Sequence, residues 1–134
     1  MARAFAIVDD RADDMDRLDA VAVKALVRLF GFWKARIADA ARLAGVGART
    51  FSRMRAEKWD GALNEDQRLR ASALVGLYKG LHLYFGAELA DTWVKMPNDG
   101  PLFGGRTPLA YMLEGGLPAI LEVRDYVDAL RGGA

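Results

Sequence analysis

Apolar residues recur at helical spacing along most of the chain, and this pattern predicts a series of helices. After Asp19, a residue suited to an N-cap, apolar side chains return every three or four positions until Gly31, which weakens or ends a helix. The apolar positions of this first helix are Val21, Ala25, Leu26, Leu29 and Phe30. Two shorter helices are expected at 34–43 and 48–58.

The stretch WDGALNEDQ, residues 59–67, is typical of a connecting segment between two units, and a long helix is expected to follow it. Gly61 breaks the preceding helix, and Asn64 followed three residues later by Gln67 has the form of a capping box. From Leu69 onward an apolar set keeps the helical period for about four turns. Its members are Ala73, Leu74, Leu77, Leu81, Tyr84 and Phe85. This face must be buried against other helices.

The last third of the chain combines short helices with turn residues. A helix near 87–94 precedes the loop NDGPLFGGR, and Thr107-Pro108 is suited to an N-cap and first helical residue. That helix should stop at Gly115-Gly116, and Pro118 should open the final one. Its candidate buried positions are Ile120, Leu121, Val123, Val127 and Leu130. Because only AFAIV at 4–8 hints at strand alternation, the predicted class is all-α.

Composition and charge place these helices in a folded protein of 134 residues, with 52% apolar residues. We expect an acidic N-terminal arm at 1–18 that is ordered only when it docks, a first unit at 19–62 and a second unit at 63–134. The net charge of +1 gives no reason to expect a polyanion. However, 34–58 holds seven basic residues against two acidic ones, a local excess that can concentrate phosphate.

The absence of cysteine excludes disulfides and thiolate chemistry, and it favours a cytoplasmic location. The longest apolar run, 20–33, contains Lys24 and Arg28, and the N-terminus lacks the order of an export signal. We therefore expect neither a membrane span nor a membrane partner.

Residues 37–56 meet the requirements of a helix-turn-helix motif. Small residues allow the two helices to cross, a glycine makes the turn, and apolar residues anchor the second helix. These are Ala40, Ala41 and Ala44, then Gly45, then Val46, Phe51 and Met54. The outer face then carries Gly47, Ala48, Arg49, Ser52 and Arg53, where a recognition helix meets the major groove.

This face supplies the candidate DNA-binding residues. Arg49 and Arg53 can contact a guanine edge or a phosphate, whereas Thr50, Ser52 and Arg55 are better suited to phosphate. Two other interpretations stay open: a basic flank on a buried apolar seam, and a domain that serves dimerisation or docking. Many repressors have a capping serine where this chain has Gly47, so the helix should begin less firmly.

The second unit has an ordered set of turn residues: Trp93, Met96-Pro97-Asn98, Gly104-Gly105-Arg106-Thr107-Pro108-Leu109, Gly115-Gly116, Val123-Arg124-Asp125-Tyr126 and Arg131-Gly132-Gly133. In this order it resembles the toxin-binding domain of the Xre/MbcA/ParS antitoxin family over residues 64–133. The resemblance implies an antitoxin that neutralises a RES-domain toxin, an enzyme acting on NAD, and binds the promoter of its own operon. It also implies that the C-terminal region lies against the toxin's active-site cleft.

Four residues are candidate toxin contacts on the basis of this resemblance. Arg124 and Arg131 could pair with acidic groups of the toxin, or could lie on a solvated helix face. Arg106 could contact toxin, although a loop arginine that binds neighbouring carbonyls is favoured. Trp93 is favoured as a core residue, with an interface anchor as the alternative. The single histidine, His82, is expected to be structural, because one imidazole without cysteine makes no familiar zinc site.

No catalytic constellation, cofactor motif or metal site is recognisable, so we expect a binding protein and not an enzyme. GPLFGG, residues 100–105, superficially resembles a phosphate loop but lacks the lysine and the preceding strand. The alternatives are a stand-alone helix-turn-helix regulator without a toxin partner and, least favoured, an all-helical hydrolase. A homodimer is expected because a two-fold operator requires a two-fold reader, but the pattern does not identify the dimer surface.

Overall fold

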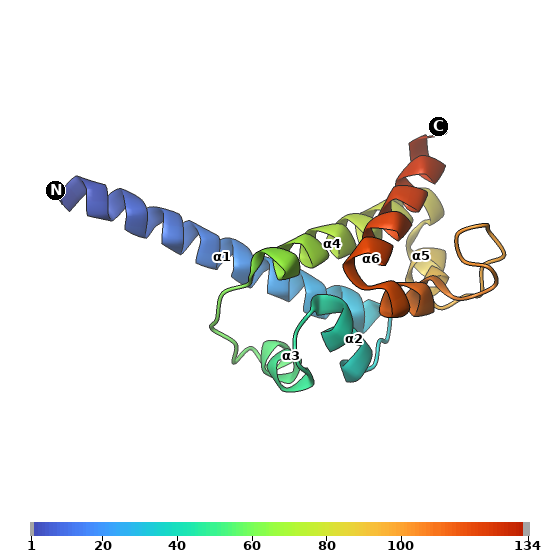
Figure 1. Ribbon diagram of the computed structural model, residues 1–134, viewed down its shortest axis with the longest axis horizontal. Coiled ribbons are helices and arrows are strands. Elements are labelled where there is room, and N and C mark those ends of the chain that lie inside the picture. The colour runs from blue at the N-terminus through green and yellow to red at the C-terminus, as the bar shows by residue number, and fades with distance from the viewer. Residues whose placement is uncertain (1, 133–134) are drawn as a thin grey trace.

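A computed structural model describes residues 2–132, and it describes the side chains from Asp13 onward. Every regular element within this range is a helix, which confirms the all-α prediction. The helices, labelled in Figure 1, are α1 (Ala2–Phe32), α2 (Ile37–Ala44), α3 (Ala48–Arg55), α4 (Glu65–Phe85), α5 (Ala87–Trp93) and α6 (Pro108–Gly132).

Helix α1 begins far ahead of the expected N-cap. Asp19 lies inside α1 with only 2% of its surface exposed, so its assignment as an N-cap is wrong. The AFAIV segment is helical and is not a strand, and residues 2–18 continue the same helix. The N-terminal part of α1 projects beyond the other helices (Figure 1). Met1 lies outside the described residues.

Helices α1 and α3 both end without the glycine that usually marks such a boundary. Lys34 (φ 52°) and Glu57 (φ 59°) adopt left-handed backbone conformations after the last helical turn. The next residue then bonds back into the helix, Ala35 N to Phe30 O at 3.0 Å and Lys58 N to Arg53 O at 2.9 Å. The predicted start at 34 and the predicted end at 58 are therefore each off by three residues.

The capping signals of the second half are confirmed. Asn64 Oδ1 accepts a hydrogen bond from Gln67 N at 2.8 Å, and Gln67 Oε1 accepts one from Asn64 N at 2.9 Å. Thr107 Oγ1 accepts a hydrogen bond from Ala110 N at 3.0 Å. Helix α6 is kinked at Gly116, whose φ of 65° and ψ of −148° separate the two helices expected there.

Helix α4 lies at the centre of the packing and contacts α1, α2, α5 and α6. Its inward positions Leu74, Leu77 and Leu81 have at most 1% exposure. The buried residues form a single cluster that runs from α1 to α6. A shared core therefore fixes the helix-turn-helix segment and the C-terminal helices relative to each other.

Candidate functional site

Helices α2 and α3 pack as the helix-turn-helix pattern requires. Ala40, Ala41 and Ala44 are all buried where α2 meets its neighbours. Phe51 and Met54 anchor α3 from the inside, with exposures of 2% and 5%. The Phe51 ring meets Phe30 of α1 edge-on at a centroid distance of 5.7 Å, so α3 is fixed by α1 as well as by α2.

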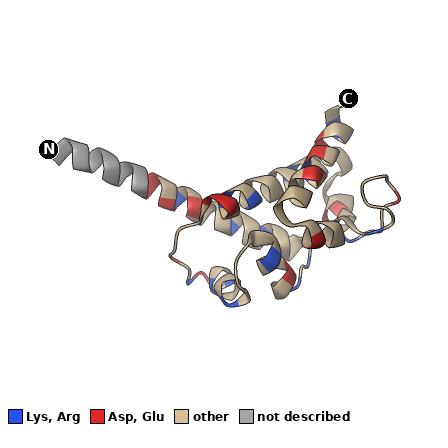
Figure 2. Cartoon of the chain, viewed as in Figure 1, with Lys and Arg blue, Asp and Glu red and all other residues tan. Residues whose placement is uncertain are grey.

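The opposite face of α3 carries the candidate DNA-binding residues, and basic positions recur along α2 and α3 in Figure 2. Arg49, Ser52, Arg53 and Arg55 are exposed, and Thr50 is half-buried. Arg53 donates from Nη2 to the carbonyl oxygen of Lys58 at 2.8 Å, so part of its guanidinium secures the end of α3. Within the described residues, the guanidinium groups of Arg49 and Arg55 make no hydrogen bond or ion pair, and both face solvent.

The N-terminus of α3 has no side-chain cap. Gly47 occupies the N-cap position with φ −73° and ψ 159°, and it offers no oxygen to the first turn. The first backbone N–H groups of a helix lack intrahelical partners, and they favour a negatively charged group. A phosphate beside Arg49 would fit both features.

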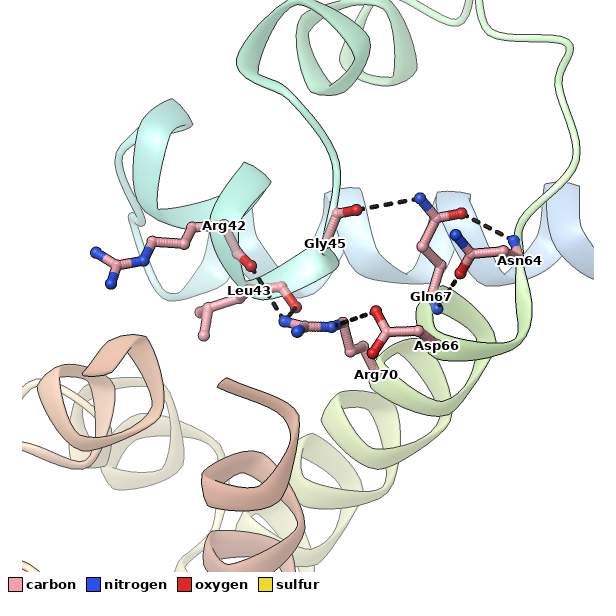
Figure 3. A network of polar contacts seen from close by, with 7 residues as sticks. All are labelled: Arg42, Leu43, Gly45, Asn64, Asp66, Gln67 and Arg70. Carbon is pink, nitrogen blue, oxygen red and sulfur yellow. Dashed lines mark hydrogen bonds and ion pairs between the residues drawn. The ribbon is translucent and has the colours of Figure 1, made fainter. Parts of the chain in front are cut away.

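The turn between α2 and α3 is held by the first turns of α4 (Figure 3). Gln67 Nε2 donates to Gly45 O at 3.1 Å. Arg70 Nη1 donates to Arg42 O at 3.2 Å and to Leu43 O at 3.3 Å, and a cation at a helix C-terminus also complements the helix dipole. Asp66 orients Arg70 through a contact of 2.8 Å with Nε. We call Gln67 and Arg70 the turn clamp.

Gly45 is required at this turn for two reasons. Its φ of 75° lies in the left-handed region that favours glycine. A Cβ at this position would lie 2.9 Å from Cδ of Arg70, so a side chain would displace the clamp. The sequence pattern located Gly45, but it gave Gln67 a capping role only and gave Arg70 none. No local signal identifies an arginine that reaches a turn more than twenty residues earlier.

An ion pair between a buried carboxylate and a partly exposed arginine connects α1 to the beginning of α4. Arg68 donates to Asp19 from Nε at 2.9 Å and from Nη2 at 3.0 Å, and Leu63 N donates to Asp19 at 3.0 Å. The hydrogen bond from Arg68 lowers the pKa of Asp19, and the Leu63 N–H acts in the same direction while burial opposes both. The sequence pattern does not predict this pair, because it places Asp19 at the N-cap of a helix.

The four candidate toxin contacts differ in availability, and Trp93 is the least available. Its side chain belongs to an aromatic cluster, and the residue has 7% exposure. The ring centroids of Phe85, Phe103 and Tyr126 lie 6.2, 5.8 and 6.3 Å from that of Trp93. This is the core position that the sequence favoured, and direct contact with a partner would require the ring to leave the cluster.

Arg106 is engaged by its own loop. Its Nε donates to Phe103 O at 3.2 Å, its guanidinium pairs with Glu114, and its Cζ lies 5.1 Å from the ring centroid of Tyr111. The role of binding a neighbouring carbonyl, which the sequence favoured, is therefore the one that the structure shows.

Arg124 and Arg131 lie on α6 and share Asp128 as a neighbour, at 3.8 and 3.5 Å. Arg124 also donates from Nη1 to Ser72 O at 3.3 Å, and it crosses α4 directly over Gly76. A Cβ on Gly76 would lie 2.5 Å from Cζ of Arg124, so Gly76 permits this close approach. Arg131 is one residue from the end of the described chain. Its side chain is 39% exposed, compared with 47% for Arg106 and 37% for Arg124.

His82 has a structural environment. Its Nδ1 lies 2.9 Å from Tyr78 O, and its Nε2 lies 3.1 Å from Asp91. Among the residues whose side chains are described, no group of histidine and carboxylate residues has the arrangement of a metal site. No helix in the described part of the chain is long and apolar enough to cross a membrane.

Comparison with known proteins accounts for most of the chain. Residues 15–76 match the antitoxin Xre-like helix-turn-helix domain, and residues 81–133 match the antitoxin Xre/MbcA/ParS C-terminal toxin-binding domain. Uncharacterized protein y4oB of Sinorhizobium fredii (strain NBRC 101917 / NGR234) is 35% identical over 113 residues, which cover 83% of this chain and 84% of that protein. Neither matched domain is an enzyme, in agreement with the expected binding role. The chain belongs to the Xre/MbcA/ParS antitoxin family, with an Xre-like helix-turn-helix domain followed by a toxin-binding domain.

Proposed function

We propose that this protein binds and blocks a RES-domain toxin that consumes NAD, and that it represses its own operon as a cytoplasmic homodimer. The observation that carries the proposal is the toxin-binding domain matched by residues 81–133. The toxin-binding domain implies a toxin partner, and the exposed basic face of α3 is suited to DNA.

On the toxin side, Arg131 is the favoured contact among the four candidates. Its guanidinium lies on an exposed turn near the end of α6, and its neighbour Asp128 is on the same helix. Within the described residues its ion-pair partner lies on α6 itself, so pairing with a carboxylate of the toxin would break no hydrogen bond or ion pair between helices. Arg106 and Arg124 bind carbonyl groups of this chain and contribute to the shape of the surface, whereas Trp93 supports it from the core.

On the DNA side, Arg49 and Arg55 are the favoured contacts to bases and phosphates, because neither guanidinium is used by the fold within the described residues. Thr50, Ser52 and the remaining donors of Arg53 complete the face. Two copies would present two such helices to a two-fold operator.

Co-expression with the product of the adjacent gene tests the inhibitory role. We expect the two proteins to co-purify, and we expect the NAD content of cells producing both to stay near that of cells producing neither. Arg131→Glu should weaken the complex, while Arg17→Glu, exposed on α1, is the matched control. Purified proteins that form no complex, with the neighbouring toxin fully active, would contradict the proposal.

A stand-alone transcriptional regulator is the second candidate, and the solvent-facing Arg49 and Arg55 favour it. It predicts specific binding to the upstream region of the gene without any toxin among the co-purified proteins. Specific DNA binding together with toxin capture supports the first proposal over this one.

A further inference from the structure

An apolar groove follows the seam between α1 and α4 and ends beside Arg124 of α6, one of the candidate toxin contacts. Its wider part has a volume of about 660 Å³ and is lined by Met15, Leu18, Ala22, Val75 and Gly76 among others. A narrower part of about 230 Å³ continues it toward Phe32 and shares Ala25, Val75 and Lys79 with the first. The groove thus follows α1 from Met15 to Phe32, about 26 Å at the rise of a helix.

The α1 side of this groove exposes large apolar side chains to an unusual degree. Leu18 and Val21 are 63% and 64% exposed, and Met15 and Phe32 are 42% and 46% exposed. Single exposed apolar residues are ordinary, but a continuous row beside a groove is typical of an interaction site. Helices in proteins gain most of their stability from packing of an apolar face, so burial of this row by a partner would stabilise this part of α1.

Charge distribution identifies the partner. The N-terminal part of α1 carries Asp13, Asp14 and Asp16, and acidic positions are visible on this part of the helix in Figure 2. The groove is lined instead by four basic side chains, Arg28, Arg68, Lys79 and Arg124, and by one carboxylate, Asp19, which pairs with Arg68. The acidic part of α1 and the mainly basic edge of the groove therefore have complementary charge. Both belong to the same chain, so a second copy can supply the partner helix.

We propose that α1 of a second copy of this chain occupies the groove, so that two α1 helices cross antiparallel near Val21. In such a two-fold arrangement the contact is reciprocal. The apolar row of each α1 enters the partner's groove, and the acidic turn of one copy lies beside Arg28 and Lys79 of the other. This inference rests on the dimer of the proposed function, but it requires neither toxin nor operator.

The mass of the purified full chain in solution, measured by sedimentation equilibrium, tests this arrangement. We expect a dimer of twice 14.7 kDa. Leu18→Glu with Val21→Glu should weaken dimerisation at least tenfold while circular dichroism and melting temperature stay those of a folded monomer, because both side chains are exposed. Leu83→Glu is the matched control, since Leu83 is 71% exposed on α4 outside the groove, and this variant should remain dimeric.

Because the chain has no cysteine, single introduced thiols report the register. Val21→Cys should form a covalent dimer on mild oxidation, and Leu83→Cys should not. Lys79→Asp should weaken the dimer, and Asp16→Lys in the same chain should restore it. A monomeric wild type, or a dimer that persists unchanged in the Leu18→Glu, Val21→Glu variant, would overturn the proposal. A wild-type monomer whose groove variant loses only toxin binding would assign the groove to the toxin instead.

Discussion

The arginines of α3 and those of the C-terminal helices differ in what their guanidinium groups contact. Arg49 and Arg55 extend from α3 into solvent. In the C-terminal half, Arg106 binds the carbonyl of Phe103 and Arg124 binds the carbonyl of Ser72 across a helix crossing. The first pair is available for a partner without loss of internal contacts, whereas the second pair would have to give up hydrogen bonds.

This difference shows that residue type alone does not identify a contact residue. All four side chains could be assigned to a phosphate or a toxin carboxylate from the sequence, because a guanidinium suits either. The structure separates them by the internal acceptors that each one reaches. A variant of a solvent-facing arginine should therefore change binding, and a variant of an engaged arginine should change stability first.

The largest effect is expected at the aromatic cluster that supports the C-terminal surface. Trp93→Ala should lower the free energy of unfolding by about 4 kcal/mol, because removal of a buried aromatic ring leaves a cavity. Urea denaturation followed by circular dichroism measures it, with Leu83→Ala as the exposed control. A variant as stable as the wild type that no longer bound toxin would instead make Trp93 a contact residue.

The next effect concerns binding alone. Arg49→Ala with Arg55→Ala should weaken binding to the upstream DNA about 100-fold and reduce the slope of its salt dependence by about 2, because two cationic contacts are lost. Fluorescence anisotropy across a series of salt concentrations measures both. Arg36→Ala removes a charge that is already paired with Asp39, and it should change affinity less. An unchanged salt slope in the double variant would exclude α3 as the DNA-binding face.

A third effect is a pH dependence from the α1–α4 ion pair. Asp19→Ala should lower the free energy of unfolding by about 2 kcal/mol near neutral pH, because the buried contacts with Arg68 and Leu63 are lost. The folded pKa of Asp19 lies below its unfolded value, so its stabilisation is complete above about pH 4 and disappears as pH falls through the folded pKa.

Urea denaturation between neutral pH and pH 2 should therefore bring wild type and Asp19→Ala together at the acidic end. Asp14→Ala removes an exposed pair with Arg17 and should lower the free energy of unfolding far less than Asp19→Ala. A constant gap between wild type and Asp19→Ala down to pH 2 would show that Asp19 stabilises the fold without its charge.

The smallest effect on stability compares two arginines of α6. Arg124→Ala should lower the free energy of unfolding by about 1 kcal/mol through its lost hydrogen bond and packing on Gly76. Arg131→Ala should lower it by less than about 0.5 kcal/mol, since its pair with Asp128 is exposed. In a binding assay with the toxin the order should reverse, with the larger loss of affinity in Arg131→Ala.

The sequence predicted the elements that local chemistry defines. Three of these features depend only on residues close together in the sequence: the reciprocal bonds of Asn64 and Gln67, the Thr107 cap and the break at Gly116. The spacing of these residues was therefore sufficient to predict them. The start of α2 and the end of α3 were each missed by three residues, because Lys34 and Glu57 adopt a left-handed conformation that the side-chain type does not indicate.

The candidate site was predictable where periodicity determines exposure, and unpredictable where distant segments meet. Burial of Phe51 followed from its spacing on α3, and exposure of Arg49 followed with it. The turn clamp and the Asp19–Arg68 pair join residues far apart in sequence, so only the packing of α4 against α1 and α2 reveals them. The division of the chain at 62/63 and the toxin contacts stay predictions.

Helix α4 has a consequence for how this protein can be switched off. The two matched domains meet inside it, between residues 76 and 81. Its N-terminal turns hold the turn between α2 and α3, and its later turns form part of the C-terminal core. A cellular protease that severed this one helix would expose apolar surface on both fragments. Under the proposed function, release of the toxin and derepression of the gene would then follow from a single cut.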